Sequence, residues 1–491
     1  MKTRRPNEFV TEPVRSVPVY AETDVVVIGG GPAGVAAALA AARGGARVIL
    51  VEQYGYLGGK PATCHNPILN WVDPKVQGGI ATEIFESLRA ANQIMPESYI
   101  QKNSLDSCVV QEKYDCYMID EEYLKYLFDQ KTQEAGVEIL FNSRCTGVSK
   151  EGEKITGVFI ETLEGRLAIL TETLIDASGY AFVAWQAGAP VVGENFEIPT
   201  DDFLGERIPT QSGYNTGVWF RNMDYEKYRE YAQTHPEWEK WHCGRESYVK
   251  WKEDGRLKER FAYFSKAEWP DGRAWSMCAH YPIPKGRQPW EADVASDAEL
   301  VIRESTWNLV NLLHEIPGME NITVEQTAVA AVCGTGQHRL DGEYCLVSRD
   351  LFNREGFEDS IFVSNTVPDI YHVDGRSHYC VDIGILPYEV PYRILLARNF
   401  DNLLCPGSSA STDMTVWSCT AHVVQCMQAG QAAGTAAALA KKKGTTPKHL
   451  DVKALQEQLR KDGVVVKASE IPPERMAVYR ERAETMRGQE S

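Results

Sequence analysis

Small residues near the start of the chain have the types and spacing of a site for a nucleotide diphosphate. The run Gly29-Gly30-Gly31-Pro32-Ala33-Gly34 follows the apolar stretch Val25–Ile28 and precedes an Ala-rich stretch. In such a turn Gly29 reverses the chain, Gly31 lets the backbone approach a pyrophosphate, and Gly34 lets the helix lie close to the strand. The first N–H groups of that helix have no partner within it and can bind phosphate.

An acidic residue completes this pattern. Glu52 ends a second apolar run, Val48–Val51, and lies 18 residues after Gly34. A carboxylate at about this spacing binds a ribose hydroxyl in dinucleotide sites. The sequence therefore predicts strand, glycine turn, helix, strand and acid, with Gln53 beside the acid. This module alone fits NAD as well as FAD.

Residues 371–379, Tyr-His-Val-Asp-Gly-Arg-Ser-His-Tyr, form the densest group of polar and titratable side chains in an otherwise apolar stretch. Oxidation of an alcohol or amine needs a base near the reacting carbon, and histidine is the usual one. His378 is the first candidate catalytic base, followed by His372 and His338; a hydrogen-bonded structural histidine is the alternative for each. The candidate substrate-binding residues are Arg339, Arg376, His65 and Tyr379.

Composition and charge limit the classes of partner. The net charge of −17 argues against a nucleic-acid partner, which needs a basic surface. No apolar run reaches about 18 residues, so no membrane span is expected. Residues 1–22 have no apolar core and are interpreted as a polar arm, not as a secretory signal. The 12 cysteines contain no C-x-x-C, which indicates reduced thiols in a cytoplasmic protein and no metal site.

Tryptophan divides the chain into regions. Eight of the 11 Trp residues fall between Trp219 and Trp307, which suggests a separate domain in the middle. Before it, Ile155–Thr162 and Arg166–Leu170 predict a hairpin. After it, a long helix rich in Ala and Gly is expected over Ala421–Lys443, where small residues allow close packing of backbones.

Several spaced segments, in order, resemble the FAD-dependent oxidoreductase family that shares the glutathione-reductase-like flavin fold. They are Glu52 with Gly58-Gly59 and Thr63, Asp176-Ala177-Ser178-Gly179, Tyr388–Arg393, Asn402–Gly407 and Cys426–Gly434. The chain departs from the family at His338 and Thr335, where arginines are common, and at Ala421 and Val424, where an Arg and a Pro are common. Because arginines hold carboxylates by a bidentate fork, these departures argue against a small dicarboxylate substrate.

The resemblance implies an α/β fold: a Rossmann-like FAD-binding domain, whose parallel sheet carries an antiparallel hairpin insertion, and a second α+β substrate or cap domain. The expected divisions are the arm 1–22, the FAD-binding domain 23–194 and 331–445, the Trp-rich cap 195–330, and a peripheral helical segment 446–491. The residues expected to bind FAD without a covalent link are Gly29, Gly31, Pro32, Ala33, Gly34, Glu52, Gln53, Gly58, Gly59, Thr63, Cys145, Ala177, Gly179, Gly407 and Ser411. A covalent link at Cys64 or His65 is the alternative.

The implied activity is oxidation of a small polar organic substrate by hydride transfer to flavin N5. Reduction of a C=C bond, as in fumarate reductases, and a flavin-binding RNA-modification protein are the alternatives. A further alternative is a dehydrogenase that uses only a nicotinamide cofactor, or a non-catalytic dinucleotide sensor. No second G-x-G-x-x-G module for a nicotinamide is visible. The electron acceptor and the substrate are not identified by the sequence, and a homo-oligomer is compatible with it.

Overall fold

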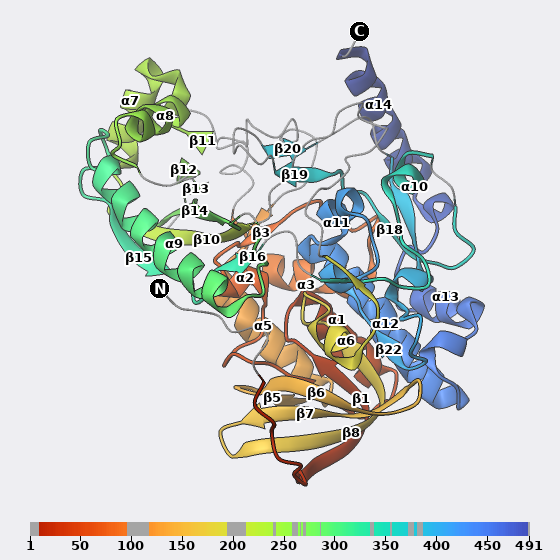
Figure 1. Cartoon of the computed structure of the whole chain (residues 1–491). Helices are drawn as coiled ribbons and strands as arrows, with labels where there is room; N and C mark the ends of the chain where they lie inside the picture. Colours follow the sequence, from red (N-terminus) through yellow and green to blue (C-terminus); the bar gives the residue numbers. More distant parts are fainter. Residues whose placement is uncertain are drawn as a thin grey trace.

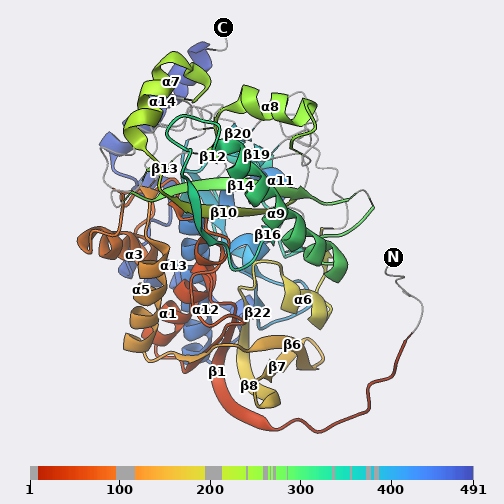
Figure 2. The ribbon, with the colours of Figure 1, turned by 90° about the vertical axis from the view of Figure 1, so that its left-hand side faces the viewer.

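The computed structural model describes residues 9–95, 117–193, 213–238, 242–257, 264–265, 267–268, 272–284, 286–333, 338–353, 356–371, 378–380 and 386–489. Two sheets organise these residues (Figure 1). In both views strands β6 to β8 of the larger sheet lie at the lower end of the molecule, and the second sheet, with β10 and β14, lies above them (Figures 1 and 2).

The larger sheet has the strand order β5-β2-β1-β8-β7-β6, with β22 also paired to β8. Its strands are β1 (Val19–Ile28), β2 (Val48–Val51), β5 (Glu138–Leu140), β6 (Arg144–Glu151), β7 (Lys154–Thr162), β8 (Gly165–Asp176) and β22 (Leu403–Leu404). Strands β5, β2, β1, β8 and β22 are paired in parallel, whereas β6, β7 and β8 are antiparallel. The predicted fold class, a parallel sheet with an antiparallel hairpin, is confirmed.

The apolar runs form the centre of this sheet because both of its faces are covered. Val25 and Val27 lie in one buried cluster, with helices α1 (Pro32–Arg43) and α12 (Val423–Lys443). Val26 and Ile28 lie in a different cluster, on the side of β7. Alternate residues of a strand point to opposite faces, so a strand buried on both faces is apolar throughout.

Two boundaries differ from the sequence prediction. Strand β8 runs without a break through Leu170 to Asp176, although the sequence analysis ended this strand at Leu170. No turn residue interrupts it, and its second half pairs with β1 and β22. The closing helix begins at Val423, and the residues before it form the short helix α11 (Met414–Thr420).

The second sheet, here called the cap sheet, is antiparallel and comes from the Trp-rich region. Its strands are β10 (Gly213–Arg221), β13 (Ala267–Glu268), β14 (Ala274–Pro282), β15 (Thr323–Thr327) and β16 (Val332–Cys333). Helix α9 (Ala292–Leu313) packs against it. Trp238 and Trp275 are fully buried, as expected of large aromatic side chains in a core.

Smaller elements complete the described chain. They are α2 (Lys60–Thr63), β3 (Ile68–Leu69), α3 (Gly79–Ala90), β4 (Tyr117–Met118), α5 (Glu121–Glu134), α6 (Phe182–Ala187), β9 (Val191–Val192), α7 (Tyr225–Thr234), β11 (His242–Cys243), α8 (Arg245–Glu253), β12 (Phe264–Ser265), β17 (Arg339–Leu340), α10 (Ser348–Asn353), β18 (Ser360–Ser364), β19 (Asp369–Tyr371), β20 (His378–Cys380), β21 (Tyr388–Pro391), α13 (Val452–Lys461) and α14 (Pro473–Gln489). In the part of the chain that the structure describes, no helix is long and apolar enough to cross a membrane.

The C-terminal segment, expected to be peripheral, is joined to the interior through α14. The Tyr479 hydroxyl donates to Asp73 Oδ2 at 2.7 Å, and Arg475 Nε donates to the same oxygen at 2.6 Å. Asp73 is 3% exposed, so both bonds lie in a largely buried site. Tyr479 and Ile471 also pack in a buried cluster with Val76.

Candidate functional site

The glycine turn after β1 is built so that no side chain fills the space beside it. Gly29 has φ +101°, and a Cβ there would lie 2.6 Å from the Ala177 carbonyl oxygen. A Cβ on Gly34 would lie 1.8 Å from the Gly29 carbonyl oxygen, so helix and strand meet backbone to backbone. Gly31 is the N-cap of α1 and makes no side-chain cap. The positive end of α1 is therefore open to a phosphate.

Glu52, at the end of β2, is held rigidly. Its Oε2 accepts from Gly30 N at 2.6 Å and its Oε1 accepts from Tyr54 N at 2.8 Å. The side chain is 6% exposed. Burial raises the pKa of this carboxyl, and the backbone N–H donors oppose that rise. A carboxylate oxygen has room for a further donor, so Glu52 can still accept from a hydroxyl.

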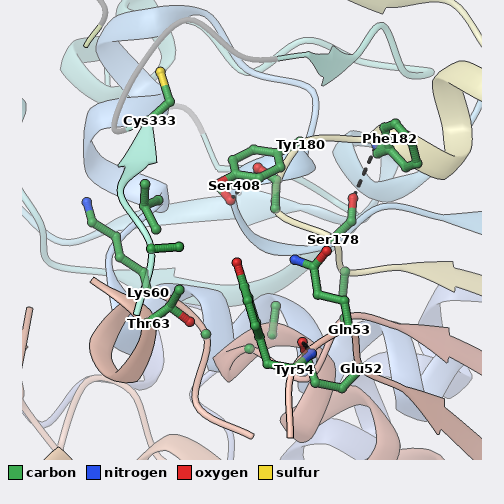
Figure 3. A pocket seen from close by; sticks show the side chains of 18 of the residues that line it. Glu52, Gln53, Tyr54, Lys60, Thr63, Ser178, Tyr180, Phe182, Cys333 and Ser408 are labelled. Atoms are coloured by element: carbon green, nitrogen blue, oxygen red, sulfur yellow. Dashed lines mark hydrogen bonds between the residues drawn. The ribbon is translucent and has the colours of Figure 1, made fainter. Parts of the chain in front are cut away.

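A cavity of about 570 Å³ extends from this turn (Figure 3). The turn and Glu52 form one side of it. Gly59, Lys60 and Thr63 come from the loop after β2 and its short helix α2. Gly59 has φ +56°, and a Cβ on it would lie 2.6 Å from Gly31 Cα. Glycine is therefore required where the two loops meet.

The start of the closing helix α12 forms another part of the wall, through Ala421, Val423 and Cys426. Its N-cap, His422, makes no side-chain hydrogen bond to the helix. The positive end of this helix can stabilise negative charge on a bound ring.

Helix α12 is positioned by contact with α1. A Cβ on Gly430 would lie 2.0 Å from the Ala33 carbonyl oxygen, and one on Gly434 would lie 2.0 Å from that of Ala37. The small residues that the sequence analysis noted are thus where two backbones touch.

The cap sheet and helix α9 line another side of the cavity. The lining residues on this side come from β10, from α9 and from the segment through β16, and they are Tyr214, Ala295, Ser296, Glu299, Ala330, Ala331, Val332 and Cys333. Backbone hydrogen bonds join the cap sheet to the segment around α2: Gly217 N donates to Cys64 O at 2.7 Å, and Ala330 N donates to Thr63 O at 3.1 Å. The cavity is therefore lined by residues from both sides.

Most residues that the sequence analysis assigned to the cofactor lie together on this cavity. The lining includes Gly29, Gly31, Pro32, Ala33, Glu52, Gln53, Gly59, Thr63, Cys145, Ala177 and Gly179. Gly34, Gly58, Gly407 and Ser411 are outside the lining. Gly58 N donates to Gly30 O at 2.9 Å, and a Cβ on Gly407 would lie 2.9 Å from that of Ala33. These two glycines support the lining residues. Ser411, 1% exposed, accepts from Gly342 N at 3.0 Å.

Lining residues that the sequence reasoning did not single out include Tyr54, Lys60, Arg144, Ser408 and Trp417. Most are next to a motif residue or a few positions from one. Their proximity to a motif was the available signal. The cap residues carried no such signal.

His65, a candidate substrate-binding residue, is fully buried and lies outside the cavity lining. Its Nδ1 contacts Glu121 Oε1, and its Nε2 donates to the Thr327 carbonyl oxygen at 3.1 Å. The same Glu121 oxygen accepts from Trp219 Nε1 at 2.8 Å. His65 also has φ +49°, a strained value for a residue with a side chain. The residue joins α5 to the cap sheet.

Cys64, the other residue considered for a covalent link, is also fully buried and outside the lining. Burial raises the pKa of its thiol to about 12. Its Sγ donates to the Lys60 carbonyl oxygen at 3.2 Å. A thiol in this state is a poor nucleophile.

The other candidates are placed differently. His338 lines the cavity and lies between two indole rings, 5.0 Å from the centroid of Trp185 and 4.0 Å from that of Trp290. Arg339 is 8% exposed; its Nε donates to the Thr412 carbonyl oxygen at 3.1 Å and its Nη1 contacts Met414 Sδ at 2.6 Å.

His372 and Arg376 lie outside the described residues. His378 and Tyr379 belong to strand β20, and only their backbone is described.

Residues 24–459 match the family described as FAD dependent oxidoreductase. The chain belongs to this family. The resemblance that the sequence motifs indicated is confirmed, and the protein is an oxidoreductase enzyme whose cofactor is FAD. The site fits this cofactor, since the open turn at Gly31 suits a diphosphate, Glu52 suits a ribose, and the cavity reaches the start of α12.

Curated relatives match mainly over shorter segments. A digeranylgeranylglycerophospholipid reductase of Methanococcus vannielii is 27% identical over 156 residues, which are 32% of this chain and 38% of the relative. Glutathione reductase of Schizosaccharomyces pombe is 37% identical over 101 residues, 21% of this chain and 20% of the relative. Among solved structures, a geranylgeranyl bacteriochlorophyll reductase-like protein of Thermoplasma acidophilum covers 95% of this chain and 88% of its own, with 13% identity and a TM-score of 0.47.

Proposed function

We propose that this FAD-dependent enzyme oxidises a small polar organic molecule bound between the FAD side of the cavity and the cap sheet. The observation that carries the proposal is the continuity of the cavity, which runs from Glu52 past the start of α12 to Tyr214 and Cys333 of the cap sheet. Bound FAD supplies the capacity to accept a hydride. The absence of a second nicotinamide-type motif from the sequence favours electrons arriving from the substrate.

The protein's contribution is to orient the substrate and take its proton. His338 is the histidine candidate whose imidazole lines the cavity, among the described residues. The stack between Trp185 and Trp290 fixes the plane of its ring. A fixed imidazole can hold a substrate hydroxyl and accept its proton. His378 and His372 remain candidates for the same role on the segment 371–379.

Anaerobic bleaching of the flavin tests the reaction class. The FAD-loaded protein is mixed with sugars, amino acids, hydroxy acids and phenolics, and absorbance near 450 nm is followed; free flavin reduced by light serves as the reference for full bleaching. We expect one chemical class to bleach the flavin within seconds to minutes. Failure of all four classes, in a protein whose flavin light does reduce, would contradict the proposal.

Variants then locate the base. His338→Ala and His378→Ala are compared with His449→Ala, which changes an exposed histidine outside the cavity lining. The variant that lacks the base is expected to bleach about 100-fold more slowly or worse. Rates equal to that of His449→Ala would remove a histidine from the mechanism.

Reduction of a C=C bond is the second candidate. The observation in its favour is the similarity to digeranylgeranylglycerophospholipid reductases over about a third of the chain. Light-reduced enzyme, mixed anaerobically with fumarate or with a prenyl alcohol, would then regain its yellow colour. Bleaching by an oxidisable substrate and no reoxidation by alkenes would leave oxidation as the function.

A further inference from the structure

Four Asp, Glu, Lys or Arg side chains line the cavity, and three of them have partners. Glu52 accepts from two backbone N–H groups at the nucleotide end. Arg144 lies over the Phe182 ring, 5.7 Å from its centroid. Glu299 Oε1 accepts from Ala331 N at 2.7 Å. These three charges are therefore engaged before any substrate binds.

The fourth, Lys60, is different. Its backbone carbonyl accepts from Cys64 N at 3.2 Å, which fixes the residue in α2. Its side chain is half-buried, and within the described ranges its ammonium makes no hydrogen bond or ion pair. In Figure 3 it extends away from Glu52 and Tyr54, toward the side where Cys333 lies. A cation in a cavity wall is thus left with unused donors.

Lys60 shares the cavity with the start of α12, which lines it through Val423 and Cys426. The charge of Lys60 also opposes the rise that burial causes in the pKa of the Cys426 thiol. The cavity wall thus carries a cation and the positive end of a helix. Both features favour an anion there. The diphosphate of FAD is expected to bind the free N–H groups at the start of α1, so it does not require Lys60.

We propose that Lys60 binds the carboxylate of the substrate, and that the substrate is therefore a small organic monocarboxylate. This inference rests on the proposed function for the fate of the substrate, but the binding itself does not depend on turnover. Lysine contributes one compact charge with three donors, which suits one carboxylate and not two. A neutral isostere should bind far less well, because it leaves the ammonium without a partner.

Anion titration of the oxidised, FAD-loaded protein tests the proposal without turnover. Acetate, lactate and benzoate are added to wild type, Lys60→Gln and Lys60→Arg, and the change in flavin absorption gives each Kd; benzamide is the neutral comparison. Lys125→Gln is the matched control, because Lys125 pairs with Glu122 and lies over the Tyr56 ring. Thermal unfolding of each variant checks that it is folded.

We expect at least one of the carboxylates to bind wild type saturably and benzamide not to compete. Lys60→Gln should raise its Kd about 10-fold to 100-fold, Lys60→Arg should retain most of the affinity, and Lys125→Gln should match wild type. Equal Kd values in wild type and Lys60→Gln, or no binding of any of the three carboxylates, would overturn the proposal. Loss of FAD from Lys60→Gln with unchanged carboxylate binding would assign Lys60 to the cofactor and also overturn it. Carboxylate binding without bleaching would leave the Lys60 site standing and count against the oxidation.

Discussion

Gly430→Ala should destabilise the protein and weaken its hold on FAD, although alanine is the better helix former. In an uncrowded helix the substitution would stabilise by about 1 kcal/mol. Here the new Cβ would lie 2.0 Å from the Ala33 carbonyl oxygen. Ordinary contact needs about 3.5 Å, so α12 and α1 would have to separate by about 1.5 Å. The Ala33 carbonyl oxygen belongs to the backbone of α1, so it cannot avoid the new Cβ by a change of rotamer.

The free-energy cost of this steric clash exceeds the gain in helix propensity. Overpacking of a core costs about 1–3 kcal/mol when side chains can adjust, and a rigid backbone is at the upper end of that range. The separation would also weaken contacts along the Ala-rich faces of both helices. We therefore expect a net loss of about 2 kcal/mol in the free energy of unfolding. Because Ala33 lines the cavity, the first turn of α1 should move and FAD should dissociate more readily.

Thermal unfolding, followed by circular dichroism and by the release of flavin fluorescence, measures both effects. Gly55→Ala is the matched control, since its Cβ would lie no closer than 3.7 Å to a neighbouring atom. The control should melt and retain FAD like wild type, whereas Gly430→Ala should melt several degrees lower. If Gly430→Ala melts at or above the wild-type temperature and keeps its flavin, the argument from backbone contact is wrong.

Three other substitutions test the site and its supports. Glu52→Gln should weaken FAD binding about 10-fold to 100-fold, because a charged acceptor is lost, and flavin titration of the apoprotein measures it; an unchanged Kd would exclude a role in ribose binding. Arg339→Met should leave the melting temperature of the apoprotein unchanged or higher, because burial lowers the pKa of Arg339 to about 10 and its charge therefore costs folding energy; a large drop would show that its hydrogen bonds matter more. Burial alone would raise the pKa of Asp24, but Arg47 and Lys441 outweigh it and lower the pKa to about 2. The ionised carboxylate thus stabilises the fold above its unfolded pKa of about 4, and this contribution is lost as the pH falls toward 2. Asp24→Asn should therefore melt below wild type at pH 7, and the difference should shrink as the pH falls from about 4 toward 2; a pH-independent difference would contradict the ion-pair account.

The parts of the site that the sequence predicted are those where local backbone demands a residue type. Gly29, Gly34 and Gly59 are such positions, because a Cβ at each would collide with backbone. Glu52 was found because its distance from the turn is set by one helix and one strand. Local constraints of this kind restrict the residue type at a position, so they can be recognised from the sequence alone.

The rest depends on contacts between distant segments. Tyr214 and Cys333 reach the cavity because β10 pairs with β16, and nothing near either residue indicates that pairing. His65 follows a motif and was expected to contact the substrate, yet its side chain contacts Glu121 of helix α5 outside the cavity lining. A sequence pattern places a residue near a site but does not say which way its side chain turns.

Two segments that are far apart in the chain, residues 28–63 and residues 406–426, line the cavity together. During synthesis the glycine turn is therefore made long before the helix that lies against it. Until α12 has been made and has packed against α1, the nascent chain has an incomplete flavin site. Stable FAD binding is therefore expected only after that packing step.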